Sequence, residues 1–230
     1  MFDKLIFLHS DKSNNNVFKL DKKIEGYYQL KSFVATNNLY NVTDNNNKIY
    51  VNENGTDIII TLTNGYYYAS DLKTHLQTQM NNAMTGTVSV TLNDNTYKFT
   101  ITNTLIFSFE FFSNTTNTAR KLIGFNAENK IHALSQTSDV PIDLNPCKNI
   151  FITMSQDDNR GVEGIDFFNC SLVVNGNKDF GDVLRYVDVD NFTQTVKFKN
   201  TKIINVSFHD ASNNNIDLNS EYQIILKKIS

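Results

Sequence analysis

The sequence has little cysteine, little proline and no tryptophan. Its 230 residues include 2 Cys, 2 Pro and 9 Gly. The two cysteines, Cys147 and Cys170, form neither the disulfide framework of a small secreted domain nor the paired spacing of a zinc site. Buried free thiols are therefore the favoured interpretation, and a disulfide between the two stays open as the alternative.

Long apolar runs and an excess of one charge are also missing. The first segment, MFDKLIFLHSDK, is apolar only briefly before charges interrupt it, so it is too short for a signal-peptide core or a membrane span. The formal net charge is −3, and basic residues are interspersed with acidic ones along the chain. Because nucleic-acid binding needs a basic face, we expect no direct contact with nucleic acid. We also expect synthesis in the cytosol and no membrane span.

Asparagine, threonine and large aromatic residues are abundant instead. The chain has 17 Phe and 10 Tyr, a balance that suits β-strands. Asparagine runs at 14–16, 45–47 and 213–215 indicate tight turns, because asparagine tolerates left-handed backbone. An AT-rich genome, which encodes asparagine freely, is the compositional alternative. Many short strands between such turns predict an antiparallel β-sandwich of the single jelly-roll type.

Alternating apolar and β-branched stretches locate the expected strands. They are residues 5–8, 17–20, 27–40, 48–51, 57–63, 87–92, 96–102, 105–112, 149–154, 170–174, 195–199, 202–208 and 222–229. Asn54 and Gly55 are the strongest hairpin signal, between 48–51 and 57–63. The three stretches from 87 to 112 are expected to form a three-stranded meander.

The middle of the chain contains the helical signals. Ser70 is the candidate N-cap of a helix that ends near Asn82. Its apolar stripe consists of Leu72, Leu76, Met80 and Ala83. A brief second helix, residues 118–123, is expected to end at a left-handed Gly124. We therefore expect residues 57–135 to elaborate, or to be inserted into, a jelly roll formed by 1–56 and 136–230.

Few residues have the spacing of a catalytic or metal site. The four histidines, which are far apart in the sequence, are His9, His75, His132 and His209. His75 is expected at the edge of the helix stripe rather than as a ligand. The Phe-rich run 107–112 has no basic residues between its aromatics, so it predicts core packing and not a base-stacking platform.

Two acidic segments are weak candidates for a metal site. Asp188 and Asp190 alternate, so in a strand they would share one solvated face. The segment that contains Asp157, Asp158, Asn159 and Gly161 lacks the ordered spacing and closing glutamate of a calcium loop, so an ordinary turn is expected. We expect no catalytic residue, no cofactor and no metal ion.

Three stretches carry a family resemblance. They are FLHSDKSNNN leading to LYNVTDNNNKIYV; ITLTNGYYYASDLKTHLQTQMNNA continuing through YKFTITN to ARKLIGFN; and DFGDVLRYVDVD continuing through KIINVSFHDASNNNIDLNSEYQIILKKI. Together they resemble the single-jelly-roll penton and minor capsid proteins of virophages, Polinton-like viruses and related large DNA viruses.

The resemblance implies a structural, non-enzymatic virion protein. Such a protein would form a homopentamer at the fivefold vertices of an icosahedral capsid and would contact the surrounding trimers of the major capsid protein. A minor capsid protein, or a receptor- or glycan-binding fibre or spike protein, is the alternative. An enzyme on a β scaffold would need a carboxylate pair or a catalytic triad, which the sequence does not supply.

Overall fold

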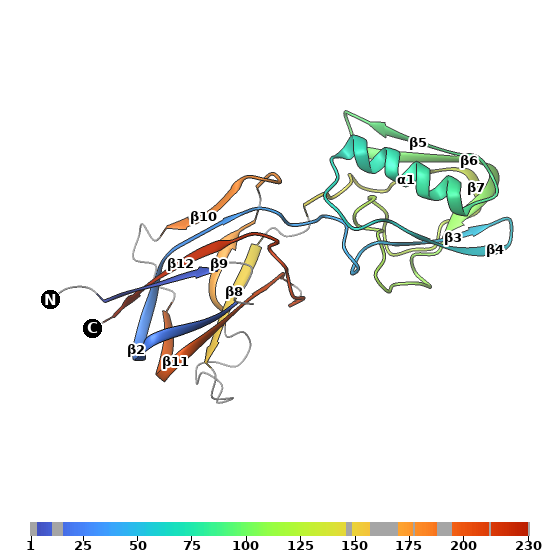
Figure 1. Ribbon diagram of the computed structural model, residues 1–230. Helices are drawn as coiled ribbons and strands as arrows, with labels where there is room; N and C mark the ends of the chain where they lie inside the picture. The colour runs from blue at the N-terminus through green and yellow to red at the C-terminus, as the bar shows by residue number, and fades with distance from the viewer. Residues whose placement is uncertain are drawn as a thin grey trace. The chain divides into compact units, whose positions relative to one another are not determined.

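The computed structural model describes residues 4–10, 16–145, 149–156, 170–176, 178–187, 195–211 and 213–229. The chain forms two compact units (Figure 1). Unit 1 consists of Met1–Leu39 and Cys147–Ser230, and unit 2 consists of Tyr40–Pro146. Each unit has its own sheet and its own apolar core.

Unit 1 is an antiparallel sheet that joins strands from both ends of the chain. Its strands are β1 (Leu5–Ser10), β2 (Val17–Thr36), β8 (Asn149–Gln156), β9 (Cys170–Asn175), β10 (Val183–Val187), β11 (Thr195–His209) and β12 (Tyr222–Lys228). Their order is β1-β12-β2-β11-β8-β9, and β10 also pairs with β2. The chain therefore returns from unit 2 to complete the sheet that its first strands began.

Strand β2 is the centre of this sheet and is longer than expected. The stretches 17–20 and 27–40, predicted as separate, belong largely to one strand of 20 residues. Likewise 195–199 and 202–208 are parts of β11, whose register against β2 shifts on either side of Thr201. A β-bulge accommodates residues that break the apolar alternation. The pairing of β11 with β2 therefore continues where the sequence pattern predicts the end of a strand.

An aromatic cluster fills the core of unit 1. The ring centroids of Phe208 and Tyr222 are 4.9 Å apart in an edge-to-face arrangement. Phe18 and Phe33 also contact Tyr222, at 6.1 and 6.3 Å between centroids. All four side chains are buried. Because they come from β2, β11 and β12, the cluster ties β2 to the two C-terminal strands.

Unit 2 is an antiparallel sheet with one helix. Its elements are β3 (Lys48–Glu53), β4 (Thr56–Thr61), α1 (Ala69–Ala83), β5 (Val88–Asn93), β6 (Lys98–Phe109) and β7 (Ala133–Thr137). The strand order is β4-β3-β6-β5, and β7 pairs with β6. Helix α1 buries Leu72, Leu76 and Met80, and it contacts β4 and β5. The expected stripe is therefore confirmed for these three residues, whereas Ala83 is exposed.

The predicted N-cap of α1 is wrong. Ser70 lies inside the helix, the N-cap position is Tyr68, and no side chain caps the helix there. The Leu72 amide donates to the Tyr68 carbonyl at 2.8 Å, so the helix begins earlier than the serine signal indicates. The Ser70 carbonyl instead accepts a hydrogen bond from the Thr74 hydroxyl at 3.0 Å.

The predicted three-stranded meander is also wrong in part. Residues 98–109 form the single strand β6, because no turn interrupts the chain between the two expected stretches. Besides β3 and β5, β6 also pairs with β7, which lies in a segment expected to be a polar connection. The expected helix 118–123 is only a turn, in which the Ile123 amide donates to the Ala119 carbonyl at 3.0 Å. Gly124 ends it at φ 79°, as predicted.

The Asn54–Gly55 hairpin is confirmed. Both residues have positive φ, 47° and 87°, and they connect β3 to β4. Because β3 pairs with β4 and β6, unit 2 begins before residue 57 and is wider than the predicted segment 57–135. The expected fold class, antiparallel and all-β with a helical element in the middle of the chain, is confirmed.

Candidate functional site

A polar pocket of about 290 Å³ lies in unit 2, where loops near residues 45, 118 and 144 meet. Among the described residues that line it, Leu122 is apolar and the others are polar. The polar and charged side chains in its lining include those of Asn45, Thr115, Thr118, Arg120, Lys121 and Asp143. No segment of the sequence predicted this pocket, because its walls come from loops that lie far apart along the chain.

Two asparagines fix the wall of the pocket. The buried Asn41 side chain donates to the Tyr67 carbonyl at 2.8 Å and accepts from the Tyr67 amide at 2.9 Å. Asn46 donates to the Asn41 carbonyl at 2.9 Å and accepts from the Thr43 amide at 2.7 Å. These side-chain amides are engaged with the backbone of unit 2, so they shape the pocket and leave ligand contacts to other residues.

The turn that contains Arg120 and Lys121 is anchored to strand β3. The Lys48 amide donates to the Asn117 carbonyl at 2.8 Å, and the Ala119 amide donates to the Lys48 carbonyl at 2.7 Å. Arg120 is half-buried and Lys121 is exposed. Within the described part of the chain, neither side chain forms an ion pair. The pocket therefore presents two cations from a fixed backbone.

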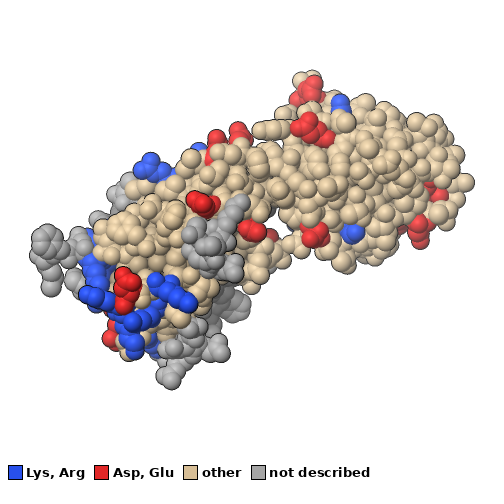
Figure 2. All heavy atoms as spheres, viewed as in Figure 1, with Lys and Arg blue, Asp and Glu red and all other residues tan. Residues whose placement is uncertain are grey.

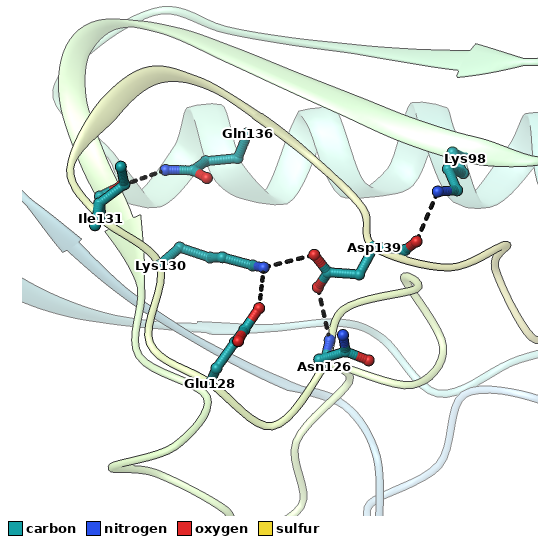
Figure 3. A network of polar contacts seen from close by, with 7 residues as sticks. All are labelled: Lys98, Asn126, Glu128, Lys130, Ile131, Gln136 and Asp139. Carbon is teal, nitrogen blue, oxygen red and sulfur yellow. Dashed lines mark hydrogen bonds and ion pairs between the residues drawn. The ribbon is translucent and has the colours of Figure 1, made fainter.

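A second polar network in unit 2 is structural (Figure 3). Lys130 lies between Glu128 and Asp139, and its ammonium is 2.6 Å from the Asp139 carboxylate. Asp139 also accepts from the Asn126 amide at 2.9 Å, and its carbonyl accepts from Lys98 of β6 at 2.6 Å. The network ties the segment 126–139 to β6.

The charges of this network hold one another in the ionised state. Burial opposes the charge of Lys130, but the hydrogen bonds and charges of Asp139 and Glu128 outweigh it and raise the Lys130 pKa. Burial likewise opposes the charge of Asp139, but the Lys130 hydrogen bond, the Asn126 amide and nearby positive charge lower the pKa of Asp139. A group held firmly in one protonation state is poorly suited to proton transfer near neutral pH.

Glu53 is a buried carboxylate that has no cationic partner among the described residues. Its Oε2 accepts from the Thr85 amide at 2.7 Å, and its Oε1 accepts from the Gly86 amide at 3.1 Å and from Asn103 at 2.7 Å. Burial alone would raise the pKa of Glu53, but these hydrogen bonds outweigh it and lower the pKa. Glu53 therefore fastens the turn after α1 to β3 and β6.

The structure brings His209 close to two hydroxyl groups. Its Nε2 lies 3.1 Å from Ser207 Oγ and 3.3 Å from Thr153 Oγ1, because Thr153 of β8 opposes Ser207 of β11. The His209 Nδ1 is buried and has no hydrogen-bond partner within the described structure. The histidine of a catalytic triad is oriented by a hydrogen bond at that atom, so the described residues place a hydrogen-bonded cluster here and not a triad.

The other histidines occupy separate places. His75 Nε2 accepts from the Thr63 amide at 3.0 Å, and the ring stacks on Tyr67 with centroids 4.8 Å apart. Burial lowers the pKa of His75. His132 is exposed near Ser108, and His9 is exposed on β1. The described residues contain no group of three His, Cys, Asp or Glu side chains that could hold a metal ion.

Several sequence candidates lie outside the described residues. These are Cys147, Asp157, Asp158, Asn159, Gly161, Asp188 and Asp190. Cys170 is the first residue of β9, opposite Thr153. The interpretations of these residues, and of a link between the two cysteines, stay predictions. No helix in the described ranges has the length and apolar character that a membrane crossing requires.

Basic residues are interspersed along the sequence but gather on part of unit 1 (Figure 2). The lysines of β1, β2, β11 and β12 and their flanks are Lys4, Lys19, Lys22, Lys23, Lys31, Lys197, Lys199, Lys202, Lys227 and Lys228. Lys197 lies 5.3 Å from the centre of the Tyr27 ring on the neighbouring strand. Asp21 and Glu25 lie on the same part of β2. The absence of nucleic-acid binding stays a prediction.

The strands of unit 1, with unit 2 inserted in its sequence, define an all-β fold of the jelly-roll type. Among solved structures, the chain is similar to the crystal structure of the mavirus penton protein, with a TM-score of 0.52 and 12% sequence identity. The match covers 98% of this chain and 100% of that chain. No family model matches the sequence, and no curated protein matches it. The likeness shows a penton-like fold, as the resemblance implied.

Proposed function

We propose that this protein is a structural capsid protein that forms the fivefold vertices of an icosahedral virion as a homopentamer. The observation that carries the proposal is the match to a penton protein over 98% of this chain and 100% of the other, which includes both units. In this role the protein has no catalytic activity and no cofactor. It is synthesised in the host cytoplasm, enters the virion and contacts trimers of the major capsid protein.

A closed ring requires two different, complementary faces on each subunit. Strand β1 ends the sheet of unit 1 and, among the described strands, pairs only with β12. Phe7 on this strand is 59% exposed, and Leu5 on the same face is 44% exposed. An edge strand with exposed apolar side chains is a natural surface for a second chain. We infer that β1 belongs to one of the two faces.

A reconstruction of the particle tests the proposal. Density at the fivefold axis is expected to fit this chain in five copies. Placement only along the facets, or on a protruding trimer, would contradict the vertex assignment and leave the fold intact. A monomer in dilute solution is compatible with the proposal, because ring closure depends on concentration and on the neighbouring trimers.

Variants at the edge strand test the inferred contact separately. We expect Phe7→Asp to reduce incorporation into particles at least about tenfold, because it buries a charge in an apolar contact. Ile59→Asp is the matched control, since Ile59 is 61% exposed but lies on β4 of unit 2. Equal incorporation of Phe7→Asp and the unaltered protein would show that β1 is not part of the contact.

A receptor- or glycan-binding virion protein remains the second candidate. The pocket in unit 2, with two cations that form no ion pair in the described part of the chain, favours it. A trimer on a fibre or spike would distinguish this role from a vertex pentamer.

A further inference from the structure

We propose that the pocket in unit 2 binds an acidic saccharide, meaning a sugar that carries a carboxylate or sulfate group. This inference goes beyond the capsid role and does not depend on it. It rests on the charge of the pocket, on its hydroxyl-binding side chains, on its size and on its fixed walls.

Arg120 and Lys121 supply the affinity for the acidic group. The guanidinium of Arg120 matches the two oxygens of a carboxylate or sulfate, and it is half-buried in the pocket without an acidic partner in the described part of the chain. Lys121 follows it and is exposed, so it attracts an anion toward the opening. A cation left unpaired in a concave site gains most when an anion displaces its water.

Neutral polar side chains supply contacts for sugar hydroxyl groups. Asn45 and Thr115 are exposed in the lining, and neither side chain has a hydrogen bond within the described structure. Asp143 lies in the same lining. Its Oδ1 accepts a hydrogen bond from the Asn145 amide at 3.1 Å, and its negative charge opposes a bare anion in the pocket. A ligand with both an acidic group and hydroxyls therefore fits the lining better than a simple anion does.

The size and stiffness of the pocket agree with a sugar ring. A volume of about 290 Å³ is at the lower end of the range for small-molecule sites. Sulfate alone would leave most of that space filled with water. Because the turn is anchored to β3 and the Asn41 and Asn46 side chains are held by backbone groups, binding does not require the walls to become ordered.

The test is a titration of the full chain with 3′-sialyllactose, lactose and sodium sulfate. Calorimetry and ligand-observed NMR measure the binding of each compound. We expect 3′-sialyllactose to bind with a Kd of about 1 mM or lower, and the other two compounds to bind at least about tenfold more weakly. Arg120→Gln and Lys121→Gln should each weaken binding, Arg120→Gln by about tenfold or more. Lys73→Gln, which removes the same charge from α1, should leave binding unchanged.

Three results would overturn the inference. Equal affinity for lactose would show a neutral-sugar site, and equal affinity for sulfate would show an anion site only. No binding of 3′-sialyllactose at about 10 mM would show no such site. If Arg120→Gln fails to fold, Lys121→Gln carries the comparison, because its side chain is exposed. Particle reconstruction tests the capsid role independently, so failure of one proposal leaves the other standing.

Discussion

Two buried tyrosines of unit 1 differ in how their hydroxyl groups are satisfied. Tyr222 donates to Asn16 Oδ1 at 2.9 Å, whereas the Tyr28 hydroxyl is buried without a partner in the described structure. Burial raises the pKa of both.

We expect Tyr222→Phe to lower the free energy of unfolding by about 1–2 kcal/mol, because it removes a hydrogen bond in the core. Tyr28→Phe removes an unsatisfied group, so it should be neutral or stabilising by up to about 1 kcal/mol. Urea denaturation measures both, and equal losses would contradict this account.

His75 should make the stability of unit 2 depend on pH. Its Nε2 accepts the Thr63 amide, which requires the neutral ring, and burial lowers its pKa below that of the unfolded chain. The unfolded chain therefore binds the proton more readily, so the contribution is present above about pH 6.5 and is lost as the pH falls below it.

Thermal unfolding between about pH 7.5 and about pH 5, on either side of the ordinary histidine pKa, measures this dependence. His75→Asn keeps an acceptor near Thr63 without titrating in this range, so its stability should depend less on pH. His9→Asn on the exposed part of β1 is the matched control. An unchanged pH dependence in His75→Asn would refute the assignment.

Residue contacts could be predicted only where they are local. The left-handed Asn54 and Gly55 follow from a two-residue turn, and Gly124 follows from the end of a short helical pattern. The contacts of Glu53 with Asn103 and of His209 with Thr153 join residues that are 50 and 56 apart. These depend on strand register, which no short-range pattern specifies.

At the scale of elements, the left-handed glycines Gly55 and Gly124 differ in their surroundings. A Cβ on Gly124 would lie 2.3 Å from the Val140 carbonyl, whereas a Cβ on Gly55 would meet nothing within 4 Å. Gly55→Ala should therefore lower the free energy of unfolding only by the backbone strain, about 1–2 kcal/mol. Gly124→Ala should cost about 2–5 kcal/mol, since a clash adds to the strain. Chemical denaturation measures the difference, and a smaller cost at Gly124 would contradict it.

Glu53 connects three elements, so its replacement should loosen all of them. Glu53→Gln loses the charge that three donors share, and we expect a loss of about 1–3 kcal/mol at neutral pH. Because the folded-state pKa is lowered, this contribution is present above the ordinary glutamate pKa and declines as the pH falls through it. Glu25→Gln, at an exposed side chain of β2, is the control. A cost that does not shrink in acid would contradict the role of the charge.

The elements were predicted well where one face is apolar and poorly where a pattern is interrupted. The stripe of α1 identified the helix, because Leu72, Leu76 and Met80 recur at helical spacing. The polar residues Asp21, Lys22 and Lys23 made β2 look like two strands, although pairing on both sides holds it in one ladder. Strand β7 carries few apolar residues, and only its partner β6 identifies it.

At the scale of the whole molecule, the two separate cores should unfold separately. Phe33→Ala removes a buried ring from unit 1 and should cost that unit about 3–5 kcal/mol. Leu76→Ala should cost unit 2 about 2–5 kcal/mol. Calorimetry should show two transitions, of which each variant shifts one. A single transition that both variants shift equally would contradict the division.

The pairing of β2 also determines the order in which a growing chain can fold. Unit 2 closes its sheet within residues 48–137, whereas β2 pairs with β10, β11 and β12, which begin at Val183. From Thr36 to Val183 the ribosome adds 147 residues, which takes about 7–30 s. During that interval β2 has both edges unpaired, and its charged segment DKK opposes association with other chains. Slower translation after residue 146 should therefore favour aggregation of unit 1 while unit 2 folds normally.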